Sequence, residues 1–445
     1  MPELLAVQSL REELLGETIS WCRNQSKYYR QRFADAGEVK CLTDMPKLPV
    51  LFREDVVDNH AAILCDPSLP AAVQHTTGTT GAFLQLHRSA GEQKFIWDFF
   101  SARLCAAPMP NPRPLYLSLS NAYHGSLIGM PTSAYTLSAG VHDMAQAQQA
   151  RGLLERRYNL PGVAPQVSLL MGTERMVKAL TAYLLADGYD LKNSPVRHLA
   201  LFGGHVTPAR KRLLARLWQA DVHDQYSMTE MFGGATEAGI GGPWVFDPHV
   251  IPEVVHPDTH EPVTEGVGVL LLTGLYPFVQ QMPLVRYFTG DLVEVTAPVD
   301  SPAGLQVYYK GRISRSVLDT NGPVLPLLLS GPLYEALEAI PDIAISPRFP
   351  DLQAGSGLEL TGDLHYDVAH SEATDDASEP ESITIRLGLR YAPWMYPDRV
   401  REVVANLTQQ LFESHPETAS RCVDGRLKLS IIPCEATEVP PYDSK

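Results

Sequence analysis

The chain has 445 residues, of which 44% are hydrophobic and 20% charged, a composition typical of a folded protein with two or three domains. Its 36 Lys and Arg against 51 Asp and Glu give a formal net charge of −15, which argues against a broad nucleic-acid or anionic-membrane surface. No apolar run approaches the roughly 20 residues of a membrane span, and the six scattered cysteines suit a reducing compartment. We therefore expect a cytoplasmic protein that binds neither nucleic acid nor membrane.

Residues 3–37 predict an N-terminal helix, because leucines recur at near-helical spacing among charged residues. Between residues 70 and 230, short apolar stretches alternate with amphipathic ones, which indicates βαβ units and a mostly parallel sheet. The expected strands are 113–119, 166–171, 196–202 and 222–226, and the expected helices between them are 174–186 and 208–218. In such sheets ligands bind at the carboxyl ends of the strands, so we expect a site in the loops that follow them.

Beyond residue 240, Pro and Gly become frequent, and runs such as 267–273 predict a β-rich subdomain of antiparallel strands. A smaller α/β segment follows, with helices expected at 333–339 and 398–413 and a strand at 427–432. We predict an α/β protein with a large N-terminal domain, 1–310, and a small, mobile α+β C-terminal lid domain, 311–445. Residues 363–382 hold seven acids and no Lys or Arg, so we expect a solvated loop and a candidate for disorder.

The stretch His75-Thr76-Thr77-Gly78-Thr79-Thr80-Gly81 lies between two strand-like runs. Its glycines permit tight turns, and its hydroxyls and backbone amides form a donor-rich cradle suited to phosphate oxygens. A Thr/Gly-rich hairpin without a ligand is the alternative. Neither a Walker-type P-loop nor a complete G-x-G-x-x-G motif is present, and His249, His256 and His260 are interpreted as loop residues, not as metal ligands.

Three further segments suit a nucleotide, with a purely structural role as the alternative for each. Gly203-Gly204 ends an expected strand and would let a flat ring approach the backbone. In Tyr226-Ser227-Met228-Thr229-Glu230 the aromatic ring can stack on a purine, the Thr can touch a phosphate and the Glu can hold Mg²⁺. In Arg286-Tyr287-Phe288-Thr289-Gly290-Asp291-Leu292 the Asp suits both ribose hydroxyls, and Arg312 further on supplies a planar fork of donors.

Together and in this order, these segments resemble the motifs of the adenylate-forming superfamily of acyl-CoA synthetases, adenylation domains and luciferases. The segment from Tyr226 to Glu230 resembles its aromatic-x-x-Thr-Glu motif, and the segment from Tyr287 to Leu292 resembles its Tyr-x-Thr-Gly-Asp-Leu motif. The short chain and the run Pro283-Leu284-Val285-Arg286-Tyr287 are most similar to the phenylacetate–CoA ligase group. The resemblance spans the chain from residue 70 to the C-terminus.

The resemblance implies a role for each motif residue. The β- and γ-phosphates of ATP would be held by Thr76, Thr77, Gly78, Thr79, Thr80 and Gly81. Gly203, Gly204 and Tyr226 would frame the adenine, and Asp291 and Arg312 would hold the ribose. Thr229 would contact the α-phosphate, and Glu230 would bind Mg²⁺.

The C-terminal run also resembles the family pattern, with departures. Family members use a late lysine to bridge the substrate carboxylate and the α-phosphate, and the similar run here ends at Lys445. A frayed terminal lysine without a role is the alternative. Arg315 stands where the family often has an acidic hinge residue, so domain rotation is expected to be tuned differently or lost. Residues 231–262 contain no Cys, so the zinc site of some relatives is not expected.

The acid substrate is expected beside the loop that holds Tyr123 and His124, and near Gly233 and Gly234. A core-facing Tyr and a structural His are the alternatives at the first two positions. The resemblance implies a ligase that activates a small carboxylic acid with Mg·ATP and transfers the acyl group to CoA. We expect the acid to be aromatic. A carrier protein, an amine or another nucleophile in place of CoA is a second reading, and a nucleotide-binding protein without catalysis is a third. A homodimer is compatible with all three.

Overall fold

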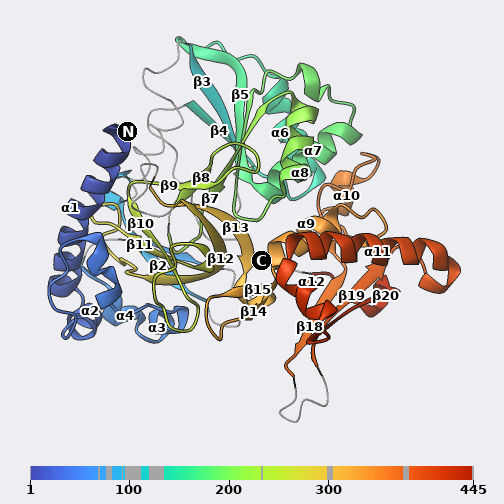
Figure 1. The fold of residues 1–445 in the computed structure, drawn as a ribbon. Helices are drawn as coiled ribbons and strands as arrows, with labels where there is room; N and C mark the ends of the chain where they lie inside the picture. Colours follow the sequence, from blue (N-terminus) through green and yellow to red (C-terminus); the bar gives the residue numbers. More distant parts are fainter. Residues whose placement is uncertain are drawn as a thin grey trace.

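The computed structural model describes residues 2–68, 71–76, 83–92, 94–95, 112–119, 135–231, 234–297, 304–373 and 380–442. An eleven-stranded mixed sheet runs through the part of the chain up to Arg312 (Figure 1). In order across the sheet its strands are β10 (Val250–Val255), β11 (Gly266–Gly274), β12 (Tyr287–Ala297), β13 (Gln306–Arg312), β9 (Trp244–Phe246), β8 (Ala235–Glu237), β7 (Asp221–Tyr226), β6 (His198–Phe202), β5 (Val163–Thr173), β3 (Arg113–Leu119) and β4 (Tyr135–Ala139).

The half of this sheet from β7 to β4 is parallel, as βαβ units require. Its covering helices are α6 (Met144–Glu155), α7 (Glu174–Ala186) and α8 (Pro208–Trp218). Helix α8 begins where Thr207 accepts a hydrogen bond from the Arg210 amide and Pro208 occupies the first turn. The fold class is confirmed, with one refinement: the β-rich subdomain continues the same sheet as its antiparallel half.

The antiparallel half packs against N-terminal helices α1 (Pro2–Gln25), α2 (Lys27–Arg32), α3 (Arg53–Asp58) and α4 (His60–Ile63) through one buried apolar cluster. The prediction of a single helix over 3–37 is wrong, because Ser26 divides it. Its hydroxyl accepts a hydrogen bond from the Tyr29 amide at 3.3 Å and donates to the Ala62 carbonyl at 2.9 Å, so Ser26 starts a new helix.

The rest of the chain has a three-stranded sheet, β18 (Tyr366–Ser371), β19 (Glu381–Leu389) and β20 (Leu427–Glu435). Helices α9 (Ser330–Glu338), α11 (Pro397–Ser414) and α12 (Pro416–Val423) pack with it around their own apolar core. Shorter elements complete it: β14 (Val317–Asp319), β15 (Leu325–Leu328), β16 (Ile345–Ser346), α10 (Pro350–Gln353) and β17 (Asp363–Leu364). The predicted domain boundary at 310–311 falls inside β13, and the division into two domains stays a prediction.

The prediction of a loop over 363–382 is wrong for most of the residues described there, whereas the expected solvent exposure is found for Asp367 and for residues 369–373. They form β17, β18 and the start of β19, because apolar side chains such as Leu364 and Tyr366 alternate into the core. Two of the acids on this segment have basic partners, one from elsewhere in the chain and one from the segment itself. Arg348 binds Asp363 at 2.8 Å, and His370 binds Glu381 at 2.8 Å. Residues 374–379 lie outside the described residues.

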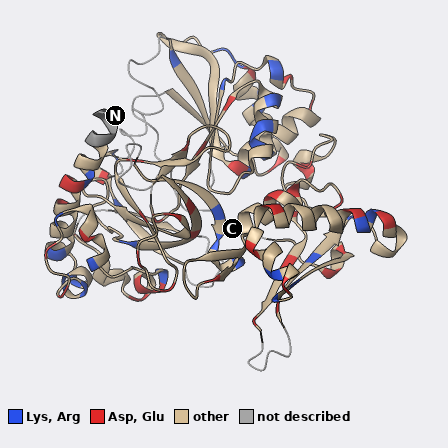
Figure 2. Ribbon diagram, in the orientation of Figure 1, with Lys and Arg blue, Asp and Glu red and all other residues tan. Residues whose placement is uncertain are grey.

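Acidic and basic positions are intermingled on the helices around both sheets (Figure 2). Within the described residues, none of the helices has an apolar stretch long enough to cross a bilayer. Because acidic and basic positions are mixed, the net negative charge does not exclude a local basic site for a ligand.

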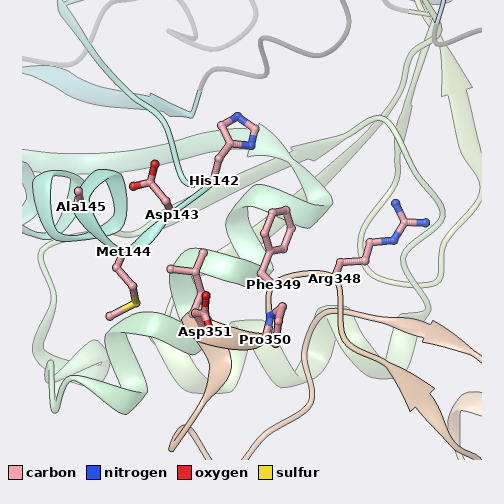
Figure 3. A pocket seen from close by; sticks show the side chains of 9 residues that line it. His142, Asp143, Met144, Ala145, Arg348, Phe349, Pro350 and Asp351 are labelled. Carbon is pink, nitrogen blue, oxygen red and sulfur yellow. The ribbon is translucent and has the colours of Figure 1, made fainter.

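The two parts of the chain contact each other through α8 and α9. Arg210 binds Glu338 at 2.9 Å, and the Thr207 hydroxyl donates to the same carboxylate. A pocket of about 370 Å³ lies further along this contact, where the start of α6 with His142 and Asp143 faces Arg348 and Phe349 before α10 (Figure 3). None of the predicted site residues lines it.

A buried ammonium group on α8 forms ion pairs with two carboxylates, one on β7 and one on β8. Lys211 binds Glu237 at 2.6 Å and Asp224 at 3.0 Å, and burial raises the pKa of Asp224 from 3.8 to about 6. Between these two pH values the folded chain keeps a proton that the unfolded chain loses, so stability falls as pH rises from about 4 to about 6. A shift of this size corresponds to roughly 3 kcal/mol.

We expect urea unfolding to show the loss of stability caused by ionisation of Asp224 as a pH-dependent difference between the wild type and Asp224→Asn. The free energy of unfolding of the wild type, relative to the variant, should decrease by roughly 2 kcal/mol between pH 4 and pH 7 and change little above pH 7. Comparison with the variant cancels the titration of the other acids. A difference that does not change with pH would contradict the assignment.

Candidate active site

The residues predicted to frame adenine lie together at the carboxyl ends of two neighbouring parallel strands. Gly203 and Gly204 follow β6, and Tyr226 ends β7. Gly203 has φ +82°, and a Cβ on Gly204 would lie 3.0 Å from the side chain of Glu174. The Gly203 position therefore favours glycine for its conformation, and a side chain at Gly204 would require Glu174 to shift.

Asp291 on β12 is buried and lies at the centre of a hydrogen-bonded group. Its Oδ2 accepts a hydrogen bond from the Tyr226 hydroxyl at 2.5 Å, and its Oδ1 lies 3.1 Å from Nε of Arg312 on β13. Burial raises the pKa of Asp291, while Arg312 opposes that shift. Asp291 also accepts a hydrogen bond from the Tyr309 side chain, and a carboxylate has about four acceptor sites, so some acceptor capacity remains for a ligand. The structure thus brings Tyr226, Asp291 and Arg312 together.

A second group surrounds Glu230, whose side chain is 10% exposed. The Tyr287 hydroxyl donates to Oε1 of Glu230 at 3.2 Å, and a guanidinium nitrogen of Arg53 lies 3.5 Å from the same oxygen. Arg53 also donates to the Thr76 hydroxyl at 3.0 Å. Arg53 therefore connects the start of the Thr/Gly loop to the carboxylate predicted to bind Mg²⁺.

The two groups belong to one site. The pKa of Arg312 is raised, mainly by Asp291 and also by the charge of Glu230, so this guanidinium is in the field of both carboxylates. Thr76, the first residue of the Thr/Gly loop, follows strand β1 (Ala71–His75), which pairs with β2 (Gln85–Ser89) as a hairpin. The residues predicted to contact the adenine, the ribose and the phosphates thus lie near one another.

A buried ion pair holds the backbone of Thr229 and Glu230. Arg88 on β2 pairs with Glu92 at 3.2 Å and donates to the carbonyls of Thr229 and Glu230 at 3.1 and 3.0 Å. Glu92 in turn accepts hydrogen bonds from the amides of Gln280 and Gln281. The pair is almost completely removed from water and holds the backbone from which the Glu230 side chain projects.

We expect Arg88→Met to lower the free energy of unfolding by about 3–5 kcal/mol, because it leaves the Glu92 carboxylate buried without its cation. Arg426→Met is the matched control, since Arg426 pairs with Asp424 at 2.9 Å with both side chains more than half exposed. The control should change stability by less than about 0.5 kcal/mol in urea unfolding. Similar losses in both variants would contradict a structural role for the buried pair.

Several predicted site residues lie outside the described residues: Thr77, Gly78, Thr79, Thr80, Gly81, Tyr123, His124, Gly233 and Lys445. Gly234 is described, and a Cβ there would lie 3.2 Å from the Tyr226 ring. Gly234 therefore lies against the predicted adenine-framing residue, and its predicted contact with the acid substrate stays a prediction.

The C-terminal run lies beside the same site (Figure 1). The guanidinium of Arg315, the residue at the hinge position, lies 4.2 Å from the centre of the Tyr442 ring. Tyr442 also stacks on Tyr366 at 4.1 Å. Burial raises the pKa of Tyr309, with further contributions from Asp291 and Tyr442, so the C-terminal run is close to the Asp291 group.

Sequence reasoning missed Arg53 and Tyr309, and it did not give the Tyr287 hydroxyl a role. No local pattern marks Arg53. It reaches the site because Leu51 pairs with the chain at Tyr287, with backbone hydrogen bonds of 3.0 and 2.9 Å to residues 286 and 288. Tyr287 belongs to the Tyr-x-Thr-Gly-Asp-Leu motif, but nothing in that local pattern indicates its contact with Glu230.

No established protein-family model matches the chain. It is 27% identical over 308 residues to phenylacetate–coenzyme A ligase of Thermus thermophilus, covering 65% of this chain and 66% of that one. It is 25% identical over 310 residues to phenylacetate–coenzyme A ligase of Pseudomonas putida, covering 66% and 68%. The matched region thus spans about two thirds of these relatives.

Among solved structures, an open conformation of 2-hydroxyisobutyryl-CoA ligase matches with a TM-score of 0.70 at 15% identity, over 98% of this chain and 90% of that one. An ATP-bound RpMatB-BxBclM chimera matches with a TM-score of 0.51 at 15% identity, over 81% and 64%. The chain has the adenylate-forming fold, and the resemblance predicted from its motifs is confirmed. Its sequence is similar to those of the phenylacetate–coenzyme A ligases.

Proposed function

We propose that this protein is an AMP-forming acid–CoA ligase. It activates a small carboxylic acid with ATP as an acyl-adenylate, releases pyrophosphate, and transfers the acyl group to CoA as a thioester. The observation that carries the proposal is the group formed by Tyr226, Asp291 and Arg312, next to the Glu230 group, in a chain whose sequence is similar to those of phenylacetate–coenzyme A ligases.

The chain's own residues position the reactants and stabilise charge. Asp291 and Arg312 would hold the ribose, and Gly203, Gly204 and Tyr226 would frame the adenine. Thr229 would contact the α-phosphate where the substrate carboxylate attacks. In this reaction catalysis comes chiefly from aligning the carboxylate with phosphorus and from cations placed where negative charge develops.

Glu230 fits a Mg²⁺ site by its chemistry. Mg²⁺ prefers oxygen ligands and is often held by one or two carboxylates together with substrate phosphates. The contacts of Arg53 and Tyr287 both fall on Oε1 of Glu230, and Arg53 also donates to the Thr76 hydroxyl. When bound, Mg²⁺ neutralises phosphate charge. Arg53 adds a second positive charge at the same place.

The acid is expected to be small and aromatic, bound beside Tyr123 and His124 and near Gly233 and Gly234. The acceptor is expected to be CoA, with a carrier protein or an amine as the alternative. A cytoplasmic location and a homodimer stay predictions.

A pyrophosphate-release assay with a panel of carboxylic acids tests the proposal. Phenylacetate, benzoate and 2-hydroxyisobutyrate should be compared, each with CoA, with an amine, with a carrier protein and with no acceptor. We expect acid-dependent release of pyrophosphate and a CoA thioester for at least one acid. Product formation with an amine or carrier protein and none with CoA would overturn the CoA step. A chain that binds ATP and activates none of the acids would overturn the adenylation step.

We expect Lys445→Ala to lower acid-dependent pyrophosphate release by about 10²–10³-fold, because one cation is lost beside the α-phosphate. Tyr442 lies beside the site, and three further residues span up to about 10 Å, so Lys445 can reach it. Thioester formation from supplied acyl-adenylate and CoA should change little. Lys428→Ala on β20 is the matched control and should leave both steps unchanged. Unchanged pyrophosphate release in Lys445→Ala would contradict the role.

A further inference from the structure

Three potential metal ligands lie together at the end of the sheet opposite the proposed active site. His198 begins β6, and Asp221 and His223 lie at the start of β7. The parallel register pairs His198 with Asp221 and Ala200 with His223. Side chains alternate along a strand, so all three residues are on one face of the sheet, and all three are exposed.

The distances between their ligand atoms suit a bound transition-metal ion. Nδ1 of His198 lies 3.3 Å from Nε2 of His223 and 3.8 Å from Oδ2 of Asp221. All three ligand atoms lie within 4.8 Å of one another. A tetrahedral ion with bonds of about 2.0–2.2 Å separates its ligand atoms by roughly 3.3–3.5 Å. The two imidazole nitrogens already have this separation, and a small rotation of Asp221 brings its oxygen to it.

We propose that His198, Asp221 and His223 bind a divalent transition-metal ion such as Zn²⁺, with water completing the coordination. Two imidazoles and one carboxylate favour Zn²⁺, Co²⁺, Ni²⁺ or Cu²⁺ over Mg²⁺ and Ca²⁺, which prefer oxygen ligands. The ion joins β6 to β7, the two strands that lead to Gly203 and Tyr226. It is separate from the Mg²⁺ proposed at Glu230.

A hydrogen bond between the two imidazole rings would also account for the distance of 3.3 Å. The two explanations differ in what happens when metal is added. The full chain, without a histidine tag and after chelator treatment, should be titrated with Co²⁺ and with Zn²⁺. Calorimetry reports the stoichiometry, and the absorption of Co²⁺ reports imidazole ligation.

We expect one equivalent of Co²⁺ or Zn²⁺ to bind to the wild type, and its affinity to fall at least 10-fold in His198→Gln and in His223→Gln. Asp221→Asn should weaken binding less, because both imidazoles remain. His370→Gln is the matched control: His370 pairs with Glu381 at 2.8 Å between β18 and β19, and the described residues place no third ligand there. Zn²⁺ should raise the thermal unfolding midpoint of the wild type and the control only.

Wild-type stoichiometry that is unchanged in both His198→Gln and His223→Gln would overturn the site, as would an equal loss in His370→Gln. The three positions are exposed, so the variants should fold, and unchanged ATP binding checks this. The inference does not depend on the adenylation chemistry. Metal binding should be unaffected by Glu230→Gln, so the failure of one proposal leaves the other standing.

Discussion

Replacing Glu230 by Gln should lower acid-dependent pyrophosphate release by at least about 100-fold. The variant keeps the size of the side chain and an oxygen that can accept from Tyr287, and it removes the negative charge that would hold Mg²⁺. Initial rates measured over a range of Mg²⁺ concentrations check the effect, and excess Mg²⁺ should not restore the rate.

Tyr287→Phe is the matched control for Glu230→Gln. It removes the hydroxyl that donates to Glu230 at 3.2 Å and leaves the carboxylate in place. We expect a loss of about 10-fold, near the lower end of the effect of one hydrogen bond to a charged group, and partial recovery at high Mg²⁺. Equal losses in both variants, or a Glu230→Gln enzyme with full activity, would exclude Glu230 as the metal ligand.

Replacing Asp291 by Asn should lower kcat/KM for ATP by about 100-fold, chiefly by raising KM. Two ribose hydroxyls would each lose a charged acceptor, and a hydrogen bond to a charged group contributes about 1.5 kcal/mol or more. The charge that orients Arg312 at 3.1 Å is lost as well. Steady-state kinetics with ATP varied at saturating acid measures the effect.

Tyr226→Phe tests the contribution of the Tyr226 hydroxyl separately from that of the Asp291 carboxylate. It removes the hydroxyl that donates to Asp291 at 2.5 Å and keeps the aromatic ring for the adenine. We expect a smaller rise in KM for ATP, about 10-fold.

The Arg312 side chain is 42% exposed, so Asp291→Asn should shift the thermal midpoint little. An unchanged KM for ATP in Asp291→Asn would contradict the ribose assignment.

Local patterns predicted much of the fold. The strand expected at 113–119 and the helices at 174–186 and 208–218 agree residue for residue with β3, α7 and α8. Their signals lie within a few residues: hydrophobic periodicity, a capping Thr207 and Pro208 in the first turn. The wrong predictions depended on distant partners. Ser26 caps α2 while bonded to residue 62, and the acidic segment becomes strand because it pairs with β16 and β19.

By itself the sequence determined the order of the nucleotide motifs, the alternation of strands and helices, and the superfamily. Each of these is carried by residues that are neighbours in the chain. Only the tertiary structure decided that Arg53 reaches both Thr76 and Glu230, and that His198 meets His223. Strand pairing brings these residues together across intervals with no periodic signal. Such contacts depend on register and packing, which local conformational preference does not encode.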